Sequence, residues 1–301
     1  MYARLARSAA SFARQAGVLA VAALLVGGCV AGGNQAGVGG SPSSSSGPSG
    51  SSGPSGSSSG GFYLRAWQTQ ALAPQATFTS LATLTISDGQ LIDGRVAVPT
   101  IYPGPLWIDP SVRSISSDGA AAVVGLARSL GLLGASQDFT DNALAGAATG
   151  HVQMIVDGIT YDLTGPVSTP ETTPAEPGTT AAFESFWQKL TDASTWLGDA
   201  LGAATPYEPT RLAVLAVAPV ESSAGINPSE TTWPLATPLS SFGSAYGGSA
   251  GRCAVVSGAD LAKLLPVVKQ SNLLTRFVDG KGVKDSLLVR VLVPGEPSPC
   301  S

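Results

Sequence analysis

The chain has 301 residues, of which 44% are hydrophobic and only 12% charged, and its formal net charge is −4. An acidic balance without a basic patch excludes binding to the phosphate backbone of nucleic acids. One histidine and three cysteines leave almost no ligands for a zinc or copper site, and we expect no metal and no cofactor.

The first 28 residues have the layout of a secretory signal peptide. Arg4, Arg7 and Arg14 precede an uncharged, Ala- and Leu-rich stretch at residues 16–26. This stretch is too short to span a hydrocarbon core comfortably, which favours a signal over a membrane helix.

The apolar stretch ends in the string VGGC, so Cys29 follows small residues. The string resembles the lipobox of bacterial lipoproteins, with Val26 where that family prefers leucine. The resemblance implies that residues 1–28 are removed and that Cys29, carrying fatty acyl chains such as palmitate, becomes the mature N-terminus. Two other interpretations stay open: an ordinary cleaved signal, and an uncleaved anchor helix that reaches to Gly33.

A linker of Gly, Ser and Pro follows at residues 29–61. From Gly32 to Gly61 it has no charge and too little apolar surface to offset the entropy of ordering, so it is predicted to be a flexible tether. Its reach is roughly 30 Å. We therefore expect the part of the chain after this linker to be held, through lipid on Cys29, on the extracytoplasmic side of a bacterial cell membrane.

The remaining residues, 62–301, form the body of the protein. Their pattern predicts an α+β fold with two modules, residues 62–205 and 206–301. Its antiparallel sheets are built from hairpins, with helices packed on one face. Both halves contain a strand, a Ser-capped helix and a further strand in the same order, which fits two similar modules. One continuous fold with a shared sheet also fits the pattern.

In the first module, residues 63–69 predict a strand. Apolar residues alternate around Asp88-Gly89 and around Asp157-Gly158. Because an Asp-Gly pair favours a two-residue turn between strands, these patterns predict two β-hairpins.

Two helices are predicted in the same module. Ser116 and Ser117 are candidate caps of the first helix. Residues 181–201 form the second, whose apolar stripe is more typical of a core than of a cofactor site. The stripe consists of Phe183, Phe186, Trp187, Leu190, Leu197 and Leu201.

The string VPTIYPGPLWIDP, residues 98–110, combines closely spaced prolines with large aromatic residues. Its four prolines enforce an extended path that carries the large side chains of Tyr102 and Trp107. Two interpretations are open. In the first, both rings belong to a preformed loop that binds a partner. In the second, which we favour, they belong to a crossover connection and pack on the sheet to exclude water.

In the second module, residues 211–219 and 286–294 predict strands. Ser257 is expected to cap a helix, with Asp260 completing an approximate capping box and Pro266 kinking the helix.

Cys253 and Cys300 are the other two cysteines, and an oxidising compartment favours their pairing in a disulfide.

Three sequence features only weakly indicate a catalytic or metal-binding site. The string Gly247-Gly248-Ser249-Ala250-Gly251 lacks the strand, helix and later histidine that a nucleophile elbow needs. His151 has no identifiable catalytic partner and is expected to be an ordinary strand-end residue. Asp138, Asp141 and Asn142 share a loop but lack the spacing of an EF-hand.

The strings TIYPGP, GLLG, PYEPTRLAVLA, WP and PGEPSPC lie in that order along the body. Together they resemble a group of actinobacterial exported proteins and lipoproteins with no assigned activity. The resemblance therefore implies no site residues.

We expect a lipid-anchored, non-catalytic binding or interaction module of the bacterial envelope, whose ligand or protein partner is unknown. Two alternatives remain open. One is an envelope hydrolase with an unassigned active site, and the other is an inhibitor or partner-docking protein.

Overall fold

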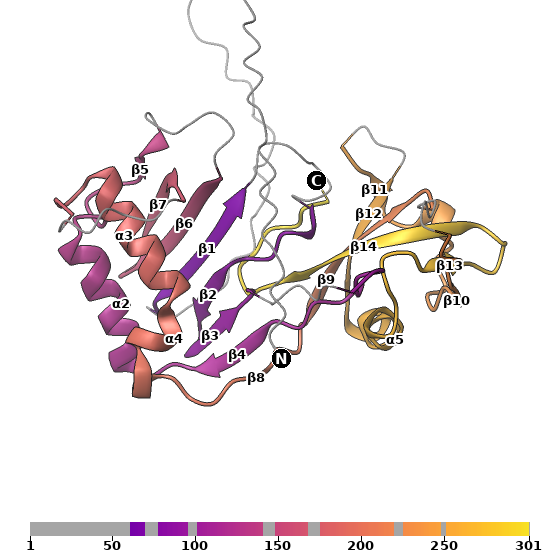
Figure 1. Ribbon diagram of the computed structural model, residues 1–301, viewed down its shortest axis with the longest axis horizontal. Coiled ribbons are helices and arrows are strands. Elements are labelled where there is room, and N and C mark those ends of the chain that lie inside the picture. Colours follow the sequence, from indigo (N-terminus) through magenta and orange to yellow (C-terminus); the bar gives the residue numbers. More distant parts are fainter. Residues whose placement is uncertain are drawn as a thin grey trace, which may run out of the picture. The chain divides into compact units, whose positions relative to one another are not determined.

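The computed structural model describes residues 61–69, 78–95, 101–140, 148–167, 175–219, 225–247 and 251–300 (Figure 1). The predictions for the signal peptide, for Cys29 and for residues 29–60 lie outside these ranges. None of the helices within them has the length and apolar character needed to cross a membrane.

Eight strands of the described chain form the first sheet, in the order β5-β7-β6-β1-β2-β3-β4-β8. Neighbouring strands are antiparallel, apart from the parallel pair β5 and β7. The strands are β1 (Tyr63–Thr69), β2 (Leu84–Ser87), β3 (Gln90–Asp93), β4 (Ser111–Ser114), β5 (Gln137–Asp138), β6 (Thr149–Val156), β7 (Ile159–Pro166) and β8 (Thr205–Pro206).

Both predicted hairpins are present. Asp88 and Gly89 have φ angles of 51° and 71°, and Asp157 and Gly158 have φ angles of 52° and 78°. Two consecutive residues with positive φ are the signature of a type I′ turn, whose twist matches that of the flanking strands. The turns therefore set the registers of β2 with β3 and of β6 with β7.

Helices cover one face of this sheet, as predicted (Figure 1). In α2 (Ser117–Ser129), the side chain of Ser116 accepts a hydrogen bond from the backbone N–H of Gly119 at 3.1 Å and so caps the helix. Thr179 caps α3 (Thr180–Thr191) in the same way.

The prediction of one helix over residues 181–201 is wrong. The segment is divided into α3, α4 (Ala193–Trp196) and the 3₁₀ turn η2 (Gly198–Ala200). Asp192 ends α3 because its backbone leaves the helical region (φ −114°, ψ 25°). Only the first five residues of the predicted stripe are buried, while Leu201 is half-buried in a bridge with Ile115.

Two glycines let α3 lie close to the sheet. Gly150 and Gly165 are register partners on β6 and β7. A Cβ atom on Gly165 would lie 2.5 Å from Cδ1 of Phe183, and one on Gly150 would lie 2.9 Å from Cε3 of Trp187. Side chains at these two positions would therefore push the helix away from the sheet.

We expect Gly165→Ala to lower the free energy of unfolding by about 1–3 kcal/mol, because the added methyl group would overlap the fully buried ring of Phe183. Urea unfolding measures the change. The control is Gly125→Ala in α2, where a Cβ atom meets nothing within 4 Å and should stabilise the helix. Equal effects of the two substitutions would contradict the close packing of α3.

The second sheet of the described chain has six strands, in the order β10-β13-β14-β9-β12-β11. Its strands are β9 (Arg211–Val217), β10 (Glu230–Thr232), β11 (Ser244–Ala245), β12 (Arg252–Ser257), β13 (Arg276–Val278) and β14 (Lys284–Leu292). The pairs are antiparallel except for β10 with β13. Both predicted strands are present, as β9 and β14.

The predicted capping box of α5 (Gly258–Lys269) does not form. Ser257 occupies the N-cap position, but its side chain makes no capping hydrogen bond. Gly258 follows with a φ of 57°, so the chain enters the helix through a left-handed residue, without the geometry that a capping box needs. The helix continues through Pro266 to Lys269.

The cores of the two sheets draw on both predicted modules. The core between α5 and the second sheet also contains Ile92, Leu106 and Trp107. The described residues belong to one compact unit, although the change from the first sheet to the second falls between Pro206 and Arg211. The division into residues 62–205 and 206–301 stays a prediction.

The predicted disulfide between Cys253 and Cys300 is present, with a Cα–Cα distance of 5.2 Å. It attaches the end of the chain to β12, on the face of the second sheet opposite α5. The fold is therefore α+β with a covalently fixed C-terminal segment.

Candidate binding site

The site begins with the alternation of side chains along β1. Leu64 and Ala66 point into the core beneath the helices. Successive residues of a strand point to opposite faces, so Arg65 and Trp67 lie on the face that the helices leave free. Their cross-strand partners on β6 are Gln153 and His151.

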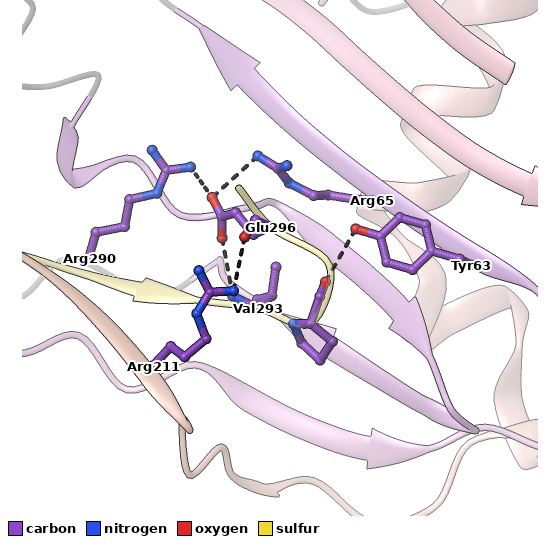
Figure 2. Close-up of polar contacts among 7 residues, drawn as sticks. Tyr63, Arg65, Arg211, Arg290, Val293 and Glu296 are labelled. Carbon is purple, nitrogen blue, oxygen red and sulfur yellow. Dashed lines mark hydrogen bonds and ion pairs between the residues drawn. The ribbon is translucent and has the colours of Figure 1, made fainter. Parts of the chain in front are cut away.

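The carboxylate of Glu296 binds side chains from both sheets (Figure 2). Its Oε1 accepts a hydrogen bond from Nη2 of Arg65 on β1 at 3.2 Å, and another from Nη2 of Arg290 on β14. Its Oε2 accepts the backbone N–H of Val293 at 3.1 Å. One carboxylate thus binds two guanidinium groups and a backbone amide.

Two more hydrogen bonds hold the segment around Glu296 in place (Figure 2). The hydroxyl of Tyr63 donates to the carbonyl of Pro294 at 3.2 Å. Nη1 of Arg211 donates to the carbonyl of Glu296 itself, also at 3.2 Å. The C-terminal segment is therefore tied to the first sheet by side chains and to the second by side chains and the disulfide.

These charges are deeply buried. The side chain of Glu296 is 1% exposed and that of Arg65 is 8% exposed. Burial lowers the pKa of Arg65, while the Glu296 carboxylate acts in the opposite direction. An arginine side chain stays charged at any physiological pH, so a positive charge persists at this depth.

Arg65 uses little of its hydrogen-bonding capacity. A guanidinium has five N–H donors. Among the described residues, the only hydrogen bond from the side chain of Arg65 goes from Nη2 to Glu296. Its Nε is buried without a partner.

Aromatic stacking positions Arg65 from the side. Its Cζ atom lies 4.3 Å from the centre of the Trp67 ring, which is a cation–π contact. Trp67 in turn stacks on His151 at 5.1 Å between centroids, with 12° between the planes. Thr69 Oγ1 lies 3.0 Å from Nε2 of His151, and Thr164 Oγ1 lies 3.3 Å from Nδ1, so the imidazole is held at both nitrogens.

Burial lowers the pKa of His151 below its ordinary value of 6.5; Asp138 opposes this shift and Arg65 adds to it. The folded protein therefore favours the neutral imidazole. Between the lowered pKa and 6.5, the unfolded chain binds a proton that the folded chain does not, so stability falls as the pH drops below about 6.5.

We expect the wild-type protein to lose thermal stability between about pH 7 and pH 5 more steeply than a His151→Gln variant does. Glutamine cannot be protonated in this range and keeps polar atoms near Thr69 and Thr164. Unfolding temperatures measured across this range test the expectation. Parallel pH profiles for the two proteins would show that His151 does not contribute.

A pocket of about 390 Å³ lies against this constellation. Its walls include Arg65, Trp67, Thr69, Gln153, Glu296 and Ser298. The pocket thus joins the free face of the first sheet to the C-terminal segment. Its size is within the range of small-molecule sites.

The structure separates the two residues predicted to share a partner-binding loop. Tyr102 is 61% exposed, whereas Trp107 is 6% exposed and belongs to the core beside α5. Nε1 of Trp107 donates to Asp109, which satisfies its polar end. Trp107 is therefore the anchor that the structural interpretation predicted, and the two rings do not form one exposed aromatic surface.

The other sequence candidates remain outside the site. Asp138 accepts hydrogen bonds from the backbone N–H and the hydroxyl of Thr140, at 2.9 and 2.6 Å. Asp141, Asn142 and Ser249 lie outside the described residues. Within the described ranges, no group of three or more His, Cys, Asp or Glu side chains is placed to hold a metal ion.

Arg65, Trp67 and Glu296 were not predicted as site residues from the sequence. A signal for the first two was present in the string YLRAWQT, where Arg and Trp alternate with core residues. Glu296 carried no such signal, because it lies in a loop 231 positions away from Arg65. Comparisons with protein-family models, curated proteins and solved structures find no match for the chain.

Proposed function

We propose that the protein is a lipid-anchored binding module of the bacterial envelope, which holds its ligand in the pocket beside Arg65. The observation that supports binding is this pocket, in which a buried guanidinium with unused donors lies beside an indole ring. The anchor is proposed from the VGGC string at Cys29 and the tether that follows it.

The anchor is tested by intact-mass analysis of protein extracted from membranes. The expected result is a diacylglyceryl adduct on Cys29 as the first residue. The Cys29→Ala variant should instead appear in the soluble extracytoplasmic fraction. An unmodified Cys29 in the mature protein would refute the proposed anchor.

The binding role is tested separately, with the full-length Cys29→Ala chain and isolated envelope material. We expect the protein to sediment with this material, and Trp67→Ala to weaken the association because it removes one wall of the pocket. Trp196→Ala is the control, since Trp196 is, like Trp67, a half-buried tryptophan, but it does not line the pocket. A chain that does not associate with envelope material would refute the binding role, whatever the state of Cys29.

A further inference from the structure

We propose that the pocket binds an oxyanion, the carboxylate or phosphate group of a small hydroxyl-bearing ligand, through the guanidinium of Arg65. This inference rests on the proposed binding function and names the chemical class of its ligand.

Arg65 has unused hydrogen-bonding capacity beside the pocket. Its side chain is more than nine-tenths buried and lines the pocket, yet among the described residues it makes one hydrogen bond. Buried N–H donors without acceptors are costly, and donors to an ionised group form the strongest hydrogen bonds. An oxyanion in the pocket accepts from this guanidinium.

The charges around the pocket also favour an anion. The single carboxylate of Glu296 is shared by Arg65 and Arg290, and both hydrogen bonds go to Oε1. Glu296 is the only acidic residue among the described residues that line the pocket. The buried guanidinium of Arg65 therefore has only a shared carboxylate oxygen as its counter-charge among the described residues, in a poorly solvated place where an anion is strongly attracted.

The pocket is preorganised for binding. Trp67 holds the guanidinium at 4.3 Å, and His151 supports the indole from β6. The part of the lining around Ser298 is fixed on one side by Glu296 and on the other by the disulfide at Cys300. Little side-chain freedom is lost on binding, so a few charge-assisted contacts are enough for a measurable affinity.

The other groups around the pocket indicate hydroxyls on the ligand. Nε2 of Gln153 donates to Asp162 at 2.9 Å, which orients the amide and leaves its oxygen to accept. Thr69, on the same strand as Trp67, also lines the pocket, with its hydroxyl 3.0 Å from Nε2 of His151. A volume of about 390 Å³ is near the lower end of the range for ligand sites and suits a ligand of one sugar-sized ring.

Isothermal titration calorimetry of the full-length Cys29→Ala chain tests the inference with three probes: glucuronate, glucose 6-phosphate and glucose. We expect at least one acidic probe to bind with a Kd of about 1 mM or lower, and glucose to bind at least about tenfold more weakly. Binding of glucuronate alone assigns the site to carboxylates, and binding of glucose 6-phosphate alone assigns it to phosphates.

The decisive variant is Arg65→Lys. Lysine keeps the positive charge beside Glu296 and so preserves the fold, but it lacks the planar fork that binds an oxyanion at two points. We expect affinity for the acidic probe to fall about tenfold or more, with unchanged circular dichroism. The matched control is Arg128→Gln, which removes an exposed arginine from α2.

Three results would overturn the inference: no heat of binding with either acidic probe, equal affinity for glucose and the acidic probes, or equal losses in Arg65→Lys and Arg128→Gln. All three leave the proposed function standing if the same chain still sediments with envelope material. Association lost in that assay refutes the binding role itself.

Discussion

Glu296→Gln should lower the free energy of unfolding by about 3–5 kcal/mol. The substitution removes the negative charge that faces Arg65 and Arg290 while it keeps the size of the side chain. Among the described residues, the buried guanidinium of Arg65 is then left without its counter-ion, and this penalty is much larger than the net value of an ion pair. The measurement is urea unfolding followed by tryptophan fluorescence.

An exposed ion pair supplies the control for this prediction. Glu230 pairs with Lys284 at 2.5 Å, with both side chains close to half exposed. Because solvent screens such a pair, Glu230→Gln should change stability by less than about 1 kcal/mol. A loss at position 296 no greater than at position 230 would mean that the buried charges are solvated in solution.

Cys300→Ser should lower the free energy of unfolding by about 4 kcal/mol under oxidising conditions. The disulfide closes a loop with a sequence separation of 47 residues, and the chain-entropy model gives this magnitude for a loop of that length. The effect arises mainly in the unfolded chain, which gains freedom when the crosslink is absent. Urea unfolding of the two oxidised proteins measures it.

Reduction provides the internal control for the second prediction. In excess dithiothreitol the wild-type protein and Cys300→Ser should have the same unfolding midpoint, since neither then contains a crosslink. The substitution should also weaken binding of an acidic probe, because the wall of the pocket around Ser298 is anchored by this bond. Equal stability of the two proteins under oxidising conditions would contradict the prediction.

Much of the secondary structure could be predicted from short segments. The Asp-Gly turns, the Ser116 cap and the strand at residues 63–69 each depend on neighbours a few residues away. The same local rules failed where two of them competed. Asp192 ended a helix whose apolar stripe continued, and Gly258 replaced the capping geometry expected at Ser257.

The candidate loop at residues 98–110 shows the limit of residue type as a guide. Tyr102 and Trp107 are similar in chemistry and are five positions apart, yet one is exposed and the other lies in a core beside α5. Large aromatic residues suit both environments. Which ring is buried depends on the packing of the second sheet, whose strands come more than 100 residues later.

Local patterns along the chain were sufficient for the α+β class, for both hairpins and for the pairing of Cys253 with Cys300, because turn chemistry, periodicity and cysteine number are properties of composition and near neighbours. The constellation of Arg65, Arg290 and Glu296 was decided only by tertiary structure. Its members are buried charges from both sheets and the C-terminal segment, and Arg65 and Glu296 are 231 positions apart. Buried charges are tolerated only when folding brings their partners together. Because these partners are far apart in the sequence, no short segment of the chain predicts their contact.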